Sequence, residues 1–131
     1  MLSETEVLIG RCYAVAFLLM GLSHLARPAI WADFIIELKQ SASAPVKIVG
    51  FTLPFGLVIV LGHSVWTPDA HGVITFFGWL MTVKCVTYLL FPEALWKISP
   101  EQRDTFVKVY RWAGCAATVI GGLLIWGTFF P

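Results

Sequence analysis

A single charged residue interrupts the third of four long apolar segments. Lys84 lies in the middle third of residues 72–91, where a charge surrounded by hydrocarbon costs at least ~2.5 kcal/mol. No Asp or Glu lies deep within any of the four segments. Two interpretations follow: a structural lysine satisfied by carbonyls, water or lipid phosphate, or part of a functional polar cavity that holds an anion. The candidate partners within the chain are Asp33, Glu37, Thr52 and Tyr88.

Three other titratable side chains lie near the ends of apolar segments. Arg11 and His63 each lie about one helical turn inside such an end, and His24 lies at the opposite end of the first segment. As a functional pair, Arg11 and His63 would clamp an anion or a carbonyl. As structural residues, Arg11 would reach lipid headgroups near Glu4 or Glu6, and His63 would be hydrogen-bonded at the membrane boundary. The same two interpretations apply to His24.

No residue pattern indicates a metal site or a catalytic centre. Cys12, Cys85 and Cys115 are far apart and lack the spacing that metals use, so we interpret them as packing residues. His71 is assigned to a loop. The sequence contains no convincing nucleophile triad, carboxylate pair, phosphate-binding loop or pair of haem-ligating histidines. It therefore predicts no metal and favours a protein that is not an enzyme.

The elements that hold these residues follow from a very apolar composition. Of the 131 residues, 58% are hydrophobic and 13% are charged, and the mean hydropathy is +0.80; an ordinary soluble domain has roughly 25% charged residues. So little polar surface cannot cover four long apolar runs, and lipid is therefore the expected solvent. A spanning helix needs about 20 apolar residues. The qualifying segments are 7–26, 46–66, 72–91 and 106–130, within a single membrane domain over residues 1–131.

A fifth, amphipathic helix is predicted over residues 28–39, between the first two spans. Pro28 suits a helix start, and Asp33 and Glu37 leave the face that the large apolar residues share. Such a helix lies along the membrane surface. A capping box that starts at Ser99 predicts that the fourth helix begins before its apolar part. The predicted fold is an all-α membrane protein, a four-transmembrane-helix bundle with a short interfacial helix between helices 1 and 2.

The distribution of Lys and Arg predicts the orientation of the spans. Nearly all basic residues fall in the links between spans one and two and between spans three and four, and the other side has only Arg11. The positive-inside rule then places both links in the cytoplasm and both termini on the non-cytoplasmic side of a bacterial inner membrane. The net charge of +1 and the absence of a basic run exclude nucleic acid as a partner. The basic residues in the links are Arg27, Lys39, Lys47, Lys97, Arg103, Lys108 and Arg111.

The last span carries a stripe of small residues at helical spacing. Ala113, Ala117 and Gly121 lie at i, i+4 and i+8 and would let another helix approach closely. That helix belongs either to the same bundle or to another copy, so the expected partners are membrane lipids and a homo-oligomer or a larger membrane complex. Phe76 and Trp79 in the third span are interpreted as core or lipid packing rather than as a cofactor site.

Residues 11–25 read RCYAVAFLLMGLSHL, with an Arg, an aromatic-Leu pair, a Gly and a His-Leu pair. This pattern, the chain length and the helix count resemble DoxX-like proteins, small four-helix bacterial membrane proteins. The resemblance implies that Arg11 and His24 occupy the polar positions. It also implies a quinone as a candidate cofactor, since some members are accessory subunits of quinone-linked sulfur oxidation. The chain differs from the family pattern at His24, where Lys is usual, and at Thr52-Leu53-Pro54, where an acidic residue is often found.

These features support three functional hypotheses. The leading one is an accessory bundle that binds a quinone, a lipid or another membrane subunit between its helices. In it, Lys84, Arg11 and His63 would orient the polar end of the ligand. The alternative is a small oligomeric transporter or channel that moves an anion or protons past Lys84. The third is a subunit of a membrane enzyme that needs a redox partner.

Overall fold

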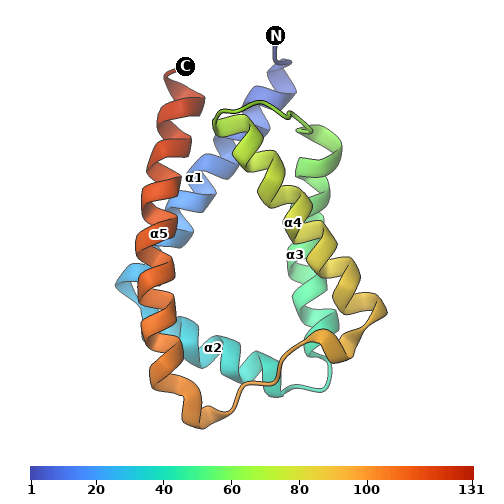
Figure 1. The fold of residues 1–131 in the computed structure, drawn as a ribbon, viewed down its shortest axis with the longest axis vertical. Helices are drawn as coiled ribbons and strands as arrows, with labels where there is room; N and C mark the ends of the chain where they lie inside the picture. The colour runs from blue at the N-terminus through green and yellow to red at the C-terminus, as the bar shows by residue number, and fades with distance from the viewer.

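The computed structural model describes residues 1–131 and contains helices but no strands (Figure 1). Four helices are long and apolar enough to cross a membrane, as predicted. The amphipathic helix predicted over residues 28–39 is present and extends to Gln40. The helices are α1 (Glu4–Ala26), α2 (Pro28–Gln40), α3 (Ala44–Gly62), α4 (Ala70–Leu90) and α5 (Arg103–Phe129), with 3₁₀ turns at Pro92–Ala94 and Pro100–Gln102.

Side-chain caps fix where three of the helices begin. Ser3 forms a capping box at the start of α1, and the carboxylate of Asp69 accepts backbone N–H groups at the start of α4. Ser99 forms a capping box with Gln102 in the 3₁₀ turn that leads into α5. Because these caps satisfy N–H groups that have no helical acceptor, α5 begins before its apolar part, as the sequence predicted.

The second long helix is shorter than the sequence suggested. It ends at Gly62, whereas the apolar run continues to Trp66. The backbone N–H of Val65 donates to the hydroxyl of Thr75 at 3.0 Å, and this hydroxyl donates to the carbonyl of His63 at 2.8 Å. A side chain of α4 thus takes the place of the next helical hydrogen bonds, and residues 63–69 form the connection to α4.

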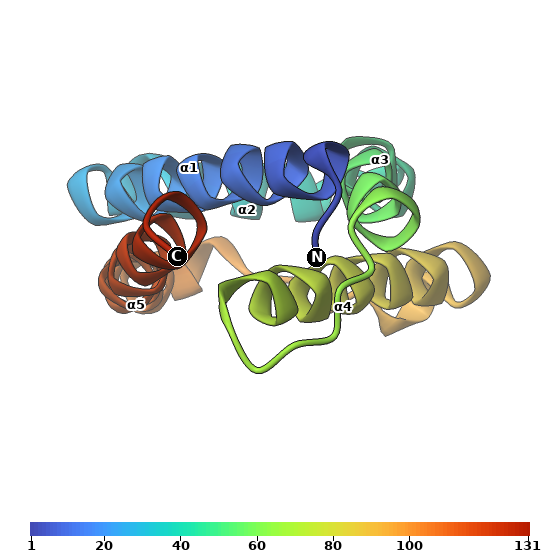
Figure 2. The ribbon, with the colours of Figure 1, turned by 90° about the horizontal axis from the view of Figure 1, so that it is seen from above.

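The four long helices form two close pairs, α1 with α5 and α3 with α4 (Figure 2). Glycines allow the close approach in both. A Cβ atom added at Gly21 would lie 2.5 Å from the backbone nitrogen of Thr118 on α5. In the other pair, Gly78 lies directly against the side chain of Ile59. Close backbone approach at small residues is the usual basis of helix association in membranes.

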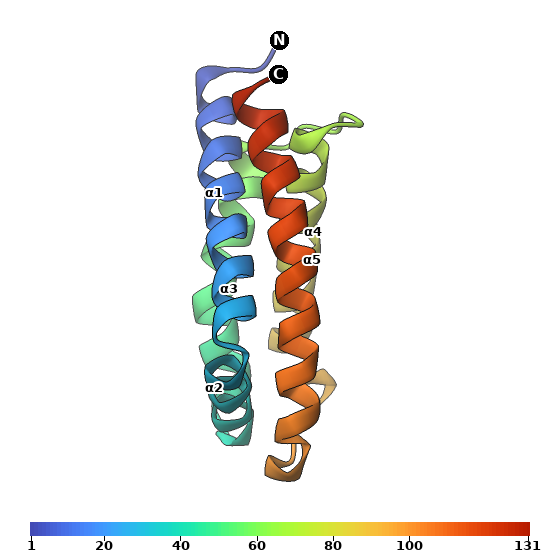
Figure 3. The same cartoon turned by 90° about the vertical axis from the view of Figure 1, so that its left-hand side faces the viewer.

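The two pairs meet at the end that carries both termini and separate toward the other end (Figure 1). Gly10 of α1 lies against His71 of α4, and Gly127 of α5 lies against Ala70. At the opposite end, α2 crosses from α5 toward the start of α3, while α1 and α5 stay side by side (Figure 3). The four helices are therefore arranged as two pairs joined mainly at one end. The buried apolar core at their junction consists of Ala14, Ile59, Ile74 and Leu124.

The helix α2 is tied to α5 by the only ion pair in the chain. Arg103 donates to both carboxylate oxygens of Asp33, at 2.5 Å from Nε and 3.1 Å from Nη2. The hydrogen bonds from Arg103 hold the pKa of Asp33 below its ordinary value of 3.8. Such a two-point contact fixes the angle of α2 as well as its position.

The ion pair predicts a small acid-dependent loss of stability. Because the pKa of Asp33 is depressed in the folded state, its stabilising effect is complete above the unfolded-state pKa and is lost as the pH falls through the folded-state value. We expect the thermal unfolding temperature, measured by circular dichroism in detergent, to fall more for the wild type than for Asp33→Asn below about pH 4. The difference should be small because both side chains are about half exposed. An equal acid response of the two proteins would contradict the prediction.

Candidate functional site

The structure gives Lys84 no acidic partner. Lys84 is exposed on α4 and makes no ion pair. Of the two acidic candidates on α2, Asp33 is bound to Arg103, and Glu37 is exposed and also unpaired. Lys39 on α2 is half-buried, and its pKa is lowered by burial and by the positive charge of Lys84. The charge of Lys84 thus acts together with burial to disfavour the protonated form of Lys39.

Arg11 turns toward α5. Its Nε donates to the backbone carbonyl of Thr128 at 3.2 Å, and its guanidinium carbon lies 5.0 Å from the centroid of the Phe129 ring. A guanidinium over an aromatic face is a cation–π contact. His63 lies instead against α1 and α4. Arg11 and His63 therefore make no direct hydrogen bond to each other, and each contacts other groups of the chain.

A buried histidine pair lies where the two helix pairs meet. His63 and His71 are 0% and 6% exposed, and Nε2 of His63 is 3.4 Å from Nδ1 of His71. Nδ1 of His63 lies 2.7 Å from the carbonyl of Glu6 and must donate to it, because a carbonyl only accepts. In the neutral pair, Nε2 of His63 then accepts a hydrogen bond from Nδ1 of His71. The pair joins α1, the end of α3 and the start of α4.

The assignment of His71 to a loop is wrong. It is the second residue of α4, because Asp69 caps the helix by accepting the backbone N–H groups of His71 and Gly72 at 2.9 and 3.2 Å. Hydrogen bonds from the Thr67 hydroxyl and from these N–H groups hold the pKa of Asp69 below its ordinary value. An Asp two residues before His71 was the sequence signal for an earlier helix start.

His24 packs against two aromatic rings at the other end of α1. Its ring centroid is 4.3 Å from that of Trp31 and 5.1 Å from that of Tyr110, and both contacts are stacked. Its Nδ1 donates to the carbonyl of Met20 at 2.5 Å. The indole N–H of Trp31 donates in turn to the hydroxyl of Ser23 at 2.9 Å. These contacts join α1, α2 and α5, and give His24 a packing role.

Thr52 is bonded within the α3–α4 pair. Its hydroxyl donates to the carbonyl of Ile48 at 2.5 Å and therefore accepts from the thiol of Cys85, 3.0 Å away. Cys85 is fully buried there. Tyr88 is half-buried one turn beyond Lys84 on α4. Of the two hydroxyl candidates, Thr52 is therefore bonded within the chain, and Tyr88 makes no hydrogen bond within it.

One polar contact between the helix pairs was not predicted from the sequence. The hydroxyl of Tyr13 on α1 donates to the carbonyl of Phe55 on α3 at 2.5 Å. Both residues lie inside apolar runs. The partner is a backbone carbonyl, which every residue carries, so no residue pattern could have identified this contact.

The small-residue stripe of α5 packs against α1 of the same chain. Ala117 and Gly121 lie at this contact, whereas Ala113 is exposed. Gly114 takes the contact position in place of Ala113, with an added Cβ atom 2.5 Å from the backbone nitrogen of Leu25. Contacts at residues 114, 117 and 121 follow the i, i+3, i+7 face of a helix.

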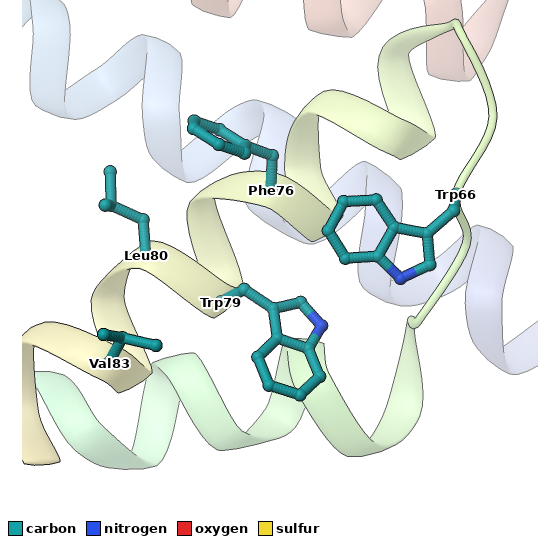
Figure 4. Close-up of a pocket in the computed structure, with 5 residues that line it drawn as sticks. All are labelled: Trp66, Phe76, Trp79, Leu80 and Val83. Carbon is teal, nitrogen blue, oxygen red and sulfur yellow. The ribbon is translucent and has the colours of Figure 1, made fainter.

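A shallow apolar groove runs along the middle of α4 (Figure 4). It has a volume of about 450 Å³ and is lined only by apolar side chains. The indole nitrogens of Trp66 and Trp79 face the space between the two rings (Figure 4), and neither makes a hydrogen bond within the chain, unlike that of Trp31. The lining residues are Trp66, Phe76, Trp79, Leu80 and Val83. Of these residues, Phe76 and Trp79 were predicted from the sequence to be core or lipid packing.

Comparisons with protein-family models, with curated proteins and with solved structures find no match to this chain. The structure has no group of three or more His, Cys, Asp or Glu side chains that could hold a metal ion. The local chemistry consists of an apolar groove with two unpaired indole N–H groups beside it and of Lys84, which makes no ion pair.

Proposed function

We propose that this chain is a multi-pass protein of the bacterial inner membrane that acts as an accessory or binding subunit for a hydrophobic ligand. The ligand class is a quinone or a lipid that carries a hydrogen-bond-accepting oxygen. This proposal rests on the apolar groove on α4 and on the two unpaired indole N–H groups that lie beside it. The quinone is proposed on the resemblance of residues 11–25 to DoxX-like proteins, and the lipid on the apolar lining of the groove.

The surface of the protein supports a membrane location. Only 22 of the 131 residues are buried, and large apolar side chains such as Phe51, Leu61 and Trp112 are 79%, 81% and 76% exposed. Patches of this kind are rare on soluble monomers but are the expected surface toward lipid. The basic links lie at the end of the molecule where α2 is found, and both termini lie at the other end (Figure 1). The positive-inside rule then favours termini on the non-cytoplasmic side.

Beside the groove, two indole N–H groups lie where a membrane offers few hydrogen-bond acceptors. Trp79 lies near the middle of α4, at a depth where no water would accept its N–H. An unsatisfied donor in such surroundings costs about 1–3 kcal/mol. A carbonyl or ester oxygen would accept from Trp79 or Trp66, while the apolar part of the ligand lies on Phe76 and Leu80. The groove is shallow and open, so the ligand would lie along the surface of α4 rather than in a closed cavity.

The proposal predicts that Trp79→Phe weakens ligand binding while the fold is retained. The substitution removes the N–H and keeps an aromatic ring, so the loss should be one hydrogen bond, about five- to tenfold in affinity. The measurement is a calorimetric titration in detergent with a short-chain quinone and, separately, with a short-chain diacyl lipid. Trp112→Phe on the exposed face of α5 is the matched control and should bind like the wild type.

Two results would overturn this function. One is an affinity for both probes that is the same in Trp79→Phe, Trp66→Phe and the wild type. The other is a wild-type protein that binds neither probe in detergent or in lipid nanodiscs. Weaker binding by Trp79→Phe to only one probe would identify which of the two ligand classes the groove takes.

A further inference from the structure

Arg11 is held in place near the end of the molecule that carries both termini (Figure 1). Its Nε donates to the backbone carbonyl of Thr128, and its guanidinium lies over the ring of Phe129. These two contacts restrict the side chain against the last turn of α5. The two terminal nitrogens of the guanidinium make no hydrogen bond within the chain, and Arg11 makes no ion pair. Arg11 therefore presents a positioned positive charge whose remaining donors are available to a ligand.

Arg11 and Glu4 line the same shallow cavity on the first two turns of α1. Leu2, Val7 and Leu8 complete the lining, which is mostly apolar. Residues 4, 7, 8 and 11 are spaced i, i+3, i+4 and i+7, so they lie on one side of the helix. A negative and a positive group thus border one apolar surface, with about two helical turns between them.

The carboxylate of Glu4 has no partner in the chain. Glu4 is exposed, and it forms no ion pair with Arg11 or with the N-terminal ammonium. The neighbouring acidic side chain, Glu6, is already engaged, because its carboxylate accepts the backbone N–H and the hydroxyl of Ser3 at 2.7 and 2.9 Å. The cavity therefore offers one hydrogen-bond-accepting anion and one hydrogen-bond-donating cation that do not neutralise each other.

We propose that Glu4 and Arg11 bind the headgroup of phosphatidylethanolamine, a zwitterionic phospholipid. Its phosphate would accept hydrogen bonds from the terminal nitrogens of Arg11, since a guanidinium fits two oxygens of a phosphate at once. Its primary ammonium would donate to the carboxylate of Glu4. The two methylene groups between them would contact Val7 and Leu8. The site needs the membrane location proposed above, but it is separate from the groove on α4 and does not depend on it.

The surface next to Arg11 favours a whole lipid over a free phosphoethanolamine ion. Val15, Leu19 and Leu22 continue along α1 from Arg11, and all three are exposed. Positions 11, 15 and 22 share one side of a helix, and position 19 lies beside them. Acyl chains that start at a phosphate on Arg11 would therefore lie on apolar side chains.

The order of the two charges also matches a lipid in a bilayer. Glu4 begins α1, and Arg11 lies seven residues further in, ~10 Å at 1.5 Å per residue. In phosphatidylethanolamine the phosphate is joined to the glycerol, and the ammonium extends away from the acyl chains. The phosphate would thus meet the deeper, basic residue, and the ammonium would meet the outer, acidic one.

This arrangement predicts a choice among headgroups. Phosphatidylglycerol has the phosphate but no cation, so its net negative charge gains from Arg11 and is disfavoured by Glu4. Phosphatidylcholine has a cation without N–H groups, which cannot donate to a carboxylate. Both should bind more weakly than phosphatidylethanolamine with the same acyl chains.

The test is native mass spectrometry of the full-length protein in detergent, titrated separately with these three lipids. Glu4→Gln should bind phosphatidylethanolamine about two- to fivefold more weakly, as for loss of an exposed ion pair, and phosphatidylglycerol no more weakly than the wild type. Arg11→Gln should weaken the binding of both about tenfold. Glu101→Gln makes the same charge change on an exposed residue at the other end of the chain and should bind like the wild type. Circular dichroism verifies that each variant is folded.

Glu4→Gln is the decisive variant because it removes no contact within the chain. An unchanged ratio of the affinities for phosphatidylethanolamine and phosphatidylglycerol in this variant would overturn the site. So would equal affinities of the wild type for all three lipids, or an equal loss in Glu101→Gln. Displacement of the lipid by free phosphoethanolamine at equal concentration would show that no lipid is recognised. Trp79→Phe should leave phosphatidylethanolamine binding unchanged, so this site and the groove can fail independently.

Discussion

Replacing Gly121 by Leu should separate α1 from α5 and destabilise the protein by about 3 kcal/mol or more. A Cβ atom at this position would lie 2.6 Å from the Cα and 2.7 Å from the backbone nitrogen of Leu18. Backbone atoms cannot rotate aside as a flexible side chain can, so α1 as a whole would have to move. Gly114 lies on the same face of α5 and is equally close to α1, so the helices could not re-pack locally.

The neighbouring glycine provides the control. Gly122 has no atom within 4 Å of an added Cβ, so Gly122→Leu makes the same change of composition on the outer face of α5 and should leave stability nearly unchanged. The measurement is the thermal or denaturant unfolding of both variants in the same detergent. Equal stability of Gly121→Leu and Gly122→Leu would show that the α1–α5 contact does not hold the fold together.

Replacing His63 by Leu should loosen the junction between the two helix pairs and destabilise the protein by roughly 2–3 kcal/mol. His63 is fully buried, and its two ring nitrogens contact the Glu6 carbonyl and the His71 ring. Leucine of similar volume would leave Nδ1–H of His71 buried without an acceptor. Gly10 lies against both rings, with an added Cβ 2.9 Å from His71 and 3.2 Å from His63, so α1 has little room to adjust.

A double-mutant cycle isolates this contact. His63→Leu, His71→Leu and the double variant should show a coupling of about 1 kcal/mol, because the double variant no longer buries an unpaired imidazole N–H. Unfolding of the four proteins in one detergent gives this value. His24, held by Trp31 and Tyr110 at the other end of α1, provides the comparison, and its coupling with His63 should be close to zero. Strictly additive effects of His63→Leu and His71→Leu would mean that the two rings do not interact.

The number and approximate extent of the helices could be predicted from the sequence because they depend on local properties, except that α3 ends at Gly62, before its apolar run does. Four apolar runs of about 20 residues, the proline at the start of α2 and the capping box at Ser99 all act within a few residues of chain. The unfavourable position of Lys84 could also be predicted, because the free-energy cost of placing a charge there depends on the apolar residues around it in α4. The spacing of Ala117 and Gly121 likewise indicated a close helix contact on one face of α5.

Which groups meet was decided by tertiary structure. Periodicity shows which residues share a face of a helix, but it does not show which other helix that face contacts. For this reason the contacts of Arg11 with Thr128 and Phe129 of α5 could not be predicted from the sequence. His63 pairs with His71 because α4 begins at Asp69, and Tyr13 binds a backbone carbonyl that has no sequence signature. Asp33 is not a partner for Lys84 because it binds Arg103, which lies seventy residues after Asp33 in the sequence. Contacts of this kind depend on how helices tilt and pair, which distant parts of the chain determine together.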